Sequence, residues 1–233
     1  MTAGISTFAG RTLGEIAAAL PGATAIFRRH KLDFCCGGAA TLADAAAERG
    51  LAADAVATEL AALQAGDAIG LAREPAALIA HILERYHDTH RRELPELIRL
   101  ARKVEAVHRD HPLAPRGLAA ALGELLNELD AHMVKEERIL FPLMREGGHP
   151  MITHPIARMQ HEHLEHGERL RALQAVAHDC VPPDGACSTW AALYAGVAKL
   201  IEDVEQHVHL ENNVLFSQFA AVPASGCGCA AGG

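Results

Sequence analysis

The chain has 233 residues, half of them hydrophobic, which is enough to bury one sizeable domain and one small domain. Its 21 basic and 29 acidic residues give a formal net charge of −8, so a surface for nucleic acid or anionic membrane is not expected. No run of about 18 apolar residues is free of charges, and the start lacks the pattern of a signal peptide. We therefore expect a cytoplasmic protein without a membrane span. The 15 histidines are unusually many and favour a metal site.

Residues 1–64 are expected to form a small helical domain, because helix-forming residues dominate and the apolar periodicity is helical. The Pro-Gly pair at 21–22 and the Cys-Cys-Gly-Gly stretch at 35–38 should interrupt its helices. Thr41 is suited to cap a helix over 42–49.

A linker is expected over residues 65–74, and a flexible tail of small residues over 221–233. Between them, residues 75–220 contain four long segments with helical periodicity, joined by short loops rich in Pro or Gly. Short loops between long helices favour antiparallel neighbours, so we predict an all-α protein with an antiparallel four-helix bundle. The four segments run over about 76–109, 116–145, 152–178 and 188–220.

Ionisable residues interrupt the apolar stripes that should face the core of this bundle. The second helix carries His132 and Glu136 in the middle of a leucine stripe, and the fourth carries His207 and Glu211 in the same way. The other two helices place histidine pairs on their stripes, namely His87 with His90 and His163 with His166.

Apolar residues should continue these stripes beyond the ionisable pairs. They are Ile139 and Leu143 in the second helix and Val214 in the fourth. Each His-x-x-x-Glu pair lies about one turn apart on one face, so both side chains can reach the same point.

Carboxylates inside a bundle need a compensating charge, because a buried, unpaired carboxylate costs several kcal/mol or protonates. A single inward histidine is usually an ordinary core residue, and one His-x-x-x-Glu pair arises by chance. Two matched pairs facing two further histidine positions favour a pair of metal ions. Imidazole and carboxylate ligands without thiolate suit iron or manganese better than structural zinc.

Geometry narrows the choice among the histidines. His108 lies 21 residues after His87, roughly 31 Å along a continuous helix, so both cannot bind one cluster. We prefer His87, which lies in the middle of the bundle. His161 and His209 fall off the stripes and should face solvent. Periodicity leaves open whether His90 and His166 are alternative ligands or neighbours of the ligands.

Several motifs together resemble the repair-of-iron-centres family, which are di-iron, hemerythrin-like bacterial proteins that respond to nitrosative and oxidative stress. The motifs are FCCGGAATLADAA, RYHDTH, ELPELI, HMVKEERILFP and HVHLENNVLF, and the similarity extends over residues 12–219. The resemblance implies a hemerythrin-like bundle preceded by a small helical domain that bears the Cys-Cys-Gly-Gly motif.

The resemblance also implies a ligand set, two iron ions and a function. The irons would be bridged by an oxo group and the two glutamates, with Cys35 and Cys36 as a redox or iron-transfer group. The resemblance leaves the roles of His90 and His166 open, with a place beside the ligands as one role. Expected ligands are His87, His132, Glu136, His163, His207 and Glu211.

The function implied is repair of damaged iron–sulfur clusters by supplying iron, with iron–sulfur proteins or a cluster scaffold as partners. The alternatives are reduction of nitric oxide to nitrous oxide at the di-iron site, and redox or oxygen sensing by binding. Nitric oxide and oxygen would be the small ligands, and a homodimer is one open oligomeric state. Cys180, Cys227 and Cys229 depart from the family pattern.

Overall fold

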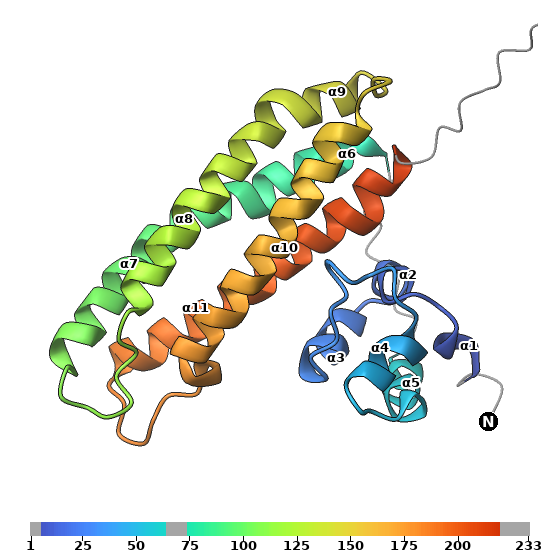
Figure 1. The fold of residues 1–233 in the computed structure, drawn as a ribbon. Coiled ribbons are helices and arrows are strands. Elements are labelled where there is room, and N and C mark those ends of the chain that lie inside the picture. The colour runs from blue at the N-terminus through green and yellow to red at the C-terminus, as the bar shows by residue number, and fades with distance from the viewer. Residues whose placement is uncertain (1–5, 64–73, 220–233) are drawn as a thin grey trace, which may run out of the picture.

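The computed structural model describes residues 6–63 and 74–219, and it confirms the expected all-α fold (Figure 1). Within these ranges no strand forms, and a single isolated bridge pairs Thr12 with Thr41. None of the helices described has the length and apolar character needed to cross a membrane. The expected tail, and the expected linker apart from Glu74, lie outside the described residues.

Short helices with identifiable caps build the small domain. Thr12 and Glu15 form a capping box at the start of α2, and the Thr41 side chain accepts from Asp44 N at the start of α4, as expected. Gly22, at φ 87°, makes the turn between α2 and α3. The helices are α1 (Ser6–Ala9), α2 (Leu13–Ala19), α3 (Ala23–Arg29), α4 (Leu42–Glu48) and α5 (Ala53–Ala62).

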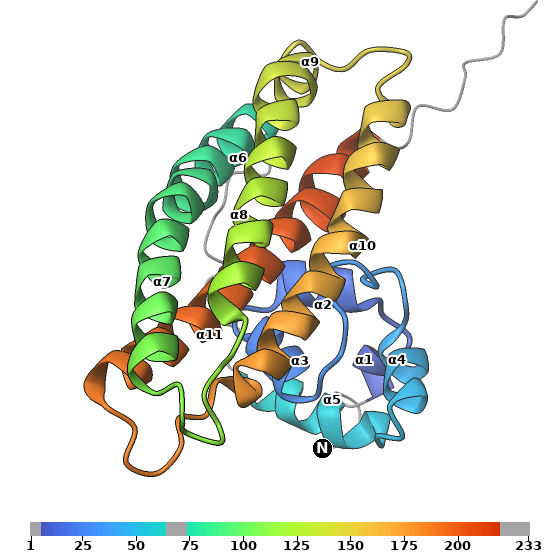
Figure 2. The same ribbon diagram turned by 60° about the vertical axis from the view of Figure 1, so that its left-hand side comes forward.

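Four long helical rods form the bundle, and consecutive rods run antiparallel (Figures 1 and 2). α7 packs against α8 and α11, and α10 packs against the same two helices, which closes the four-sided arrangement. The rods are α6 (Pro75–Ile82), η1 (Leu83–His87) and α7 (Asp88–Val107); α8 (Leu118–Lys135), η2 (Glu136–Leu140) and α9 (Phe141–Arg145); α10 (Thr153–Val176); and α11 (Ser188–His209) with η4 (Leu210–Leu215).

Three of the rods contain a π-helical segment, namely η1, η2 and η4. A π turn holds one extra residue, so the residues beyond it rotate relative to an α-helical pattern. The expectation for Ile139 was wrong for this reason: it is 55% exposed, while Leu140 and Met144 are buried. In the fourth rod the buried position at the end of the segment is likewise Leu215, and Val214 is only half-buried.

The apolar core of the bundle forms two clusters. One contains Leu94, Leu129, Leu170 and Val204, and the other contains residues such as Phe141. Along every rod, the ionisable pairs predicted from the stripes lie between the stretches that supply these two clusters. The two apolar clusters therefore enclose a polar layer at mid-bundle.

The small domain docks on α10 and on the α11–η4 rod, beside the polar layer (Figure 2). Asn213 Nδ2 donates to the carbonyls of Phe34 and Cys35 at 3.2 and 3.3 Å. A Cβ on Gly14 or Gly38 would lie 2.6 or 2.5 Å from Asn213 Oδ1, so this contact requires both glycines.

This docking corrects one expectation about the histidines. His209 was expected to face solvent, yet it is buried, with its ring 5.7 Å from that of Phe34 and its Nδ1 3.1 Å from Asn213 Nδ2. The small domain covers this face of α11, which the periodicity of the bundle cannot show. The expectation for His161 is confirmed, because its side chain is 61% exposed.

Candidate metal centre

Six predicted ligands meet at the middle of the bundle, and all of them are buried. They form two groups that share both glutamates, and within each group the ligand atoms all lie within 4.8 Å of one another. The groups are His87, Glu136, His207 and Glu211, and His132, Glu136, His163 and Glu211.

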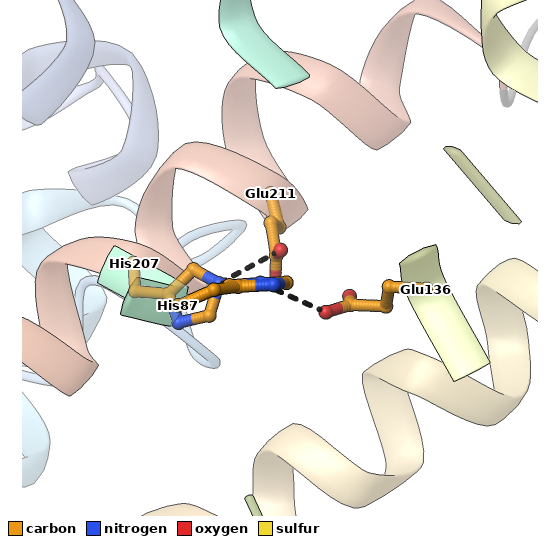
Figure 3. Close-up of side chains that lie close together, drawn as sticks. All are labelled: His87, Glu136, His207 and Glu211. Carbon is orange, nitrogen blue, oxygen red and sulfur yellow. Dashed lines mark hydrogen bonds and ion pairs between the residues drawn. The ribbon is translucent and has the colours of Figure 1, made fainter. Parts of the chain in front are cut away.

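Glu136 lies between two imidazoles that belong to different groups. Its Oε2 is 3.4 Å from His87 Nε2, and its Oε1 is 3.3 Å from His132 Nε2. Figure 3 shows the first group, in which Glu136 from one rod points toward His87 and Glu211 from others.

Glu211 has the same arrangement on the opposite side. Its Oε1 is 2.9 Å from His207 Nε2, and its Oε2 is 3.1 Å from His163 Nε2. Each carboxylate thus presents one oxygen to each group, which is the placement needed to bridge two ions.

Orphaned polar atoms show that this layer fits metal ions. His87 Nε2 lies 3.2 Å from His207 Nε2, and His132 Nε2 lies 3.1 Å from His163 Nε2, so ring nitrogens face each other in pairs. Neither carboxylate oxygen of Glu136 has a hydrogen-bond partner among the described residues. A cation within each group would satisfy nitrogens and oxygens together, since both atom types are metal ligands.

Hydrogen bonds outside the layer orient two of the imidazoles. His87 Nδ1 is 2.8 Å from Glu137 Oε1, and His132 Nδ1 is 2.9 Å from Glu162 Oε2. Because a carboxylate only accepts, each Nδ1 carries the proton and each Nε2 is left for a metal. Both carboxylates are in turn paired with cations, namely Arg91 for Glu137, and Lys135 and Arg158 for Glu162.

Sequence reasoning missed these outer residues. Glu137 directly follows the ligand Glu136, and Asn212, which contacts His163, directly follows Glu211. The polar residue that follows each glutamate in the sequence could therefore have indicated these two outer residues. Glu162 faces His132 only across the bundle, and nothing local in the sequence marks it.

π-helical segments carry three of the six predicted ligands. His87 ends η1, Glu136 begins η2, and Glu211 lies in η4. Such segments often occur at functional sites, where the extra residue redirects a side chain. The two His-x-x-x-Glu pairs keep their spacing, because η2 begins at Glu136 and η4 begins after His207.

Electrostatic coupling within the layer compensates the buried carboxylates. Burial alone would raise the pKa of Glu136 and of Glu211, yet the imidazoles of His132 and His207 lower both below the ordinary range. Burial opposes charge on His132 as well, but Glu136 beside it raises its pKa to about 10. In the metal-free protein, protons on His132 and on His87, whose pKa Glu136 raises against the effect of burial, therefore compensate the carboxylates.

His90 and His166 lie beside the layer but belong to neither group of candidate ligands. The ring of His90 is 5.4 Å from that of His207, and the ring of His166 is 4.9 Å from that of His132. Burial lowers the pKa of His90 to about 2 and that of His166 to about 3, so both are neutral at physiological pH. Both pack against imidazoles of the candidate centre.

His108 lies at the far end of the bundle, as the distance argument requires. Its Nε2 is 3.2 Å from Sγ of Cys187, the residue that precedes α11. Cys180 packs nearby against the apolar cluster that contains Leu129, and burial raises its pKa to about 11. Cys227 and Cys229 lie outside the described residues.

The adjacent thiols lie between the small domain and α10. Cys35 Sγ is 3.8 Å from Cys36 Sγ, and Cys36 Sγ donates to the carbonyl of His163 at 3.4 Å. With Asp33 they form a third group of residues that could hold a metal ion. The hydrogen bond to Cys36 and burial raise the pKa of Cys35 well above its ordinary value, so this thiol keeps its proton at neutral pH.

Four antiparallel rods around a buried layer of imidazoles and two shared carboxylates define a metal-binding protein of the hemerythrin type. Residues 78–219 match the family described as the hemerythrin HHE cation binding domain. Residues 9–64 match a second family, described as a domain of unknown function, DUF542.

Curated relatives match over almost the whole chain. The iron-sulfur cluster repair protein YtfE of Pectobacterium carotovorum is 47% identical over 209 residues, which is 88% of this chain and 95% of that protein. The YtfE proteins of Yersinia pseudotuberculosis (strain IP 31758) and Dickeya chrysanthemi are each 46% identical, over 90% and 88% of this chain and 96% and 95% of their own lengths. The chain belongs to this family of iron–sulfur cluster repair proteins.

Substitution of the candidate ligands should separate them from the other histidines. His132→Leu, His163→Leu and His207→Leu should each lower the metal content of the purified protein, with a loss in affinity of at least about tenfold. His108→Leu is the matched control and should leave the metal content unchanged. Elemental analysis after anaerobic purification measures this. Equal metal loss in the His108 variant would show that the predicted ligand set is wrong.

Metal binding should release protons. Because the pKa of His132 is raised to about 10 in the metal-free protein, this imidazole is protonated at neutral pH and must lose its proton to bind a metal. Affinity should therefore decrease as the pH falls. Titration calorimetry with ferrous ion in anaerobic buffers of different ionisation enthalpy measures the number of protons released. Binding enthalpies that do not depend on the buffer would mean that the imidazoles are neutral before the metal enters.

Proposed function

We propose that this protein holds two iron ions in the buried layer, bridged by Glu136, Glu211 and an oxo group. We further propose that it supplies iron for the repair of iron–sulfur clusters damaged by nitrosative and oxidative stress. The observation that carries the proposal is that both glutamates are shared by two groups of candidate ligands. Imidazole and carboxylate without thiolate favour iron, and the curated relatives are named iron-sulfur cluster repair proteins.

The side chains of the layer would hold and orient the ions. The Nε2 atoms of the four imidazoles converge, while outer hydrogen bonds keep the Nδ1 protons of His87 and His132 directed away from the centre. Bound iron would supply redox chemistry and positions for small ligands such as nitric oxide or oxygen. Six protein ligands for two ions leave coordination positions free of protein, and a small number of protein ligands favours release of iron as cargo.

Cys35 and Cys36 are proposed to take part in iron transfer. Their thiols and Asp33 form a separate group that could hold a metal, and Cys36 contacts the backbone of the predicted ligand His163. Thiolates are soft ligands for iron, so Cys35 would lose its proton as iron binds. Receiving partners would be cytoplasmic proteins with damaged iron–sulfur clusters, or a scaffold on which clusters assemble.

Iron transfer can be measured directly. The anaerobically purified protein should contain about two iron ions per chain, in keeping with its two groups of candidate ligands. Mixed with a cluster-free ferredoxin, sulfide and a thiol reductant, it should restore the visible absorbance of the ferredoxin cluster without added iron. The His132→Leu variant should restore much less, whereas the His108→Leu variant should match the wild type.

The same preparation tests the enzymatic alternative. Nitric oxide is added with a reductant, and nitrous oxide is followed by gas chromatography. Catalytic turnover without transfer of iron to the ferredoxin would favour a nitric oxide reductase over an iron donor. Stoichiometric zinc, with no iron after anaerobic expression, would contradict both functions.

A further inference from the structure

Asn212 connects the small domain to the candidate metal centre through a single side chain. Its Nδ2 donates to the carbonyl of Cys35 at 3.0 Å. Its Oδ1 lies 2.9 Å from His163 Nδ1. The residue directly follows Glu211 in η4, so its backbone is held next to the centre.

The contact with Cys35 determines where the protons lie. A carbonyl oxygen only accepts, so the amide nitrogen of Asn212 must face Cys35 and the amide oxygen must face His163. His163 Nδ1 therefore carries a proton and donates it to Oδ1. Nε2 is then the ring nitrogen left to bind a metal, and it lies 3.1 Å from Glu211 Oε2.

The other imidazoles are not oriented in this way. Residues of the bundle itself orient His87 and His132, because Glu137 and Glu162 are carboxylates paired with bundle cations. Nδ1 of His207 has no partner in the part of the chain that the structure describes. Among the four imidazoles, the orienting contact of His163 is the one that continues into the small domain.

Asn213 provides a matched comparison. It also donates to the carbonyls of Phe34 and Cys35, so it too ties the small domain to the bundle. Its other partner is His209, which is not a candidate ligand. Loss of Asn213 would weaken docking without touching a ligand, whereas loss of Asn212 would affect both.

We propose that Asn212 is a positioning residue that couples docking of the small domain to the half of the centre held by His132 and His163. While the domain is docked, the Cys35 carbonyl holds the amide in the orientation that leaves Nε2 of His163 free for the metal. When it undocks, the amide is free to rotate by half a turn, and its N–H group then faces Nδ1. That orientation favours the tautomer with the proton on Nε2, which cannot bind metal.

The consequence is that undocking loosens one of the two ions. This inference rests on the proposed iron centre and adds to it the regulation of release. Loss of a residue that orients a ligand typically lowers metal affinity by about 10- to 100-fold, which sets the size of the expected effect.

The first test compares the iron-loaded full-length protein with Asn212→Leu and Asn213→Ala. Asn212→Leu should release one of the two ions to a ferrous chelator about tenfold faster or more. In Mössbauer spectra of isotope-labelled iron, one of the two ferric quadrupole doublets should change and the other should not. Asn213→Ala removes a docking contact but leaves the Asn212 amide in place, so any change should fall on the same doublet and be smaller than with Asn212→Leu. Changes in both doublets with Asn212→Leu, or in neither, would overturn the proposal.

The second test separates coupling from a purely structural role. A Cβ on Gly14 would lie 2.6 Å from Asn213 Oδ1, so Gly14→Ala should push the small domain away. Gly10→Ala is its control, because nothing lies within 4 Å of the added Cβ. Gly14→Ala should speed iron release in the wild type but not in Asn212→Asp, whose carboxylate accepts from His163 Nδ1 whether or not the domain is docked. If Gly14→Ala speeds iron release equally in the wild type and in Asn212→Asp, the proposed coupling is overturned.

The two proposals fail in distinguishable ways. Unchanged melting temperatures show that the variants fold. A wild-type protein that binds no iron would overturn both the proposed function and this inference. A wild type that holds and transfers iron, with variants that release it at the wild-type rate, would overturn only the role of Asn212.

Discussion

Burial of two carboxylates between four imidazoles is the constraint on which the rest of this structure depends. Glu136 and Glu211 are fully enclosed, and a carboxylate in such a place must be neutralised by protons, by cations or by a metal. Each oxygen faces a different imidazole. Protons on the imidazoles and metal ions are therefore alternative ways to compensate this layer, and a preference for metal would depend on how the imidazoles are held.

The polar layer interrupts both the apolar core of the bundle and the regular α-helical geometry of three rods. An uninterrupted α-helical stripe would bury a single apolar core, whereas here two apolar clusters are separated by the centre. The π-helical segments allow a rod to carry a candidate ligand and still bury apolar residues on either side of it. The extra residue in each segment, at His87, Glu136 and Glu211, directs the candidate ligand inward and shifts the buried apolar positions by one residue. The shift by one residue explains why Ile139 is exposed while Leu140 beside it is buried.

The two halves of the centre have different surroundings. His87 is oriented by Glu137 and Arg91, which form a charged pair within the bundle. His163 is oriented by a neutral amide that also binds the small domain. This asymmetry is consistent with the proposals that the protein supplies iron and that one half of the centre responds to docking.

The sequence by itself determined the all-α fold and the presence of ionisable residues in its core. Helical periodicity places His132, Glu136, His207 and Glu211 on apolar stripes, where only compensated charges are tolerated. Periodicity could not choose between His87 and His90 or between His163 and His166, since each pair shares a stripe. The resemblance to a family made that choice, and the tertiary structure brings the side chains of His87 and His163 together with the glutamates. Only the tertiary structure revealed that His209 is buried and that Asn212 joins the domains. Both facts depend on contacts between segments about 175 residues apart, and such contacts leave no periodic signal in either segment.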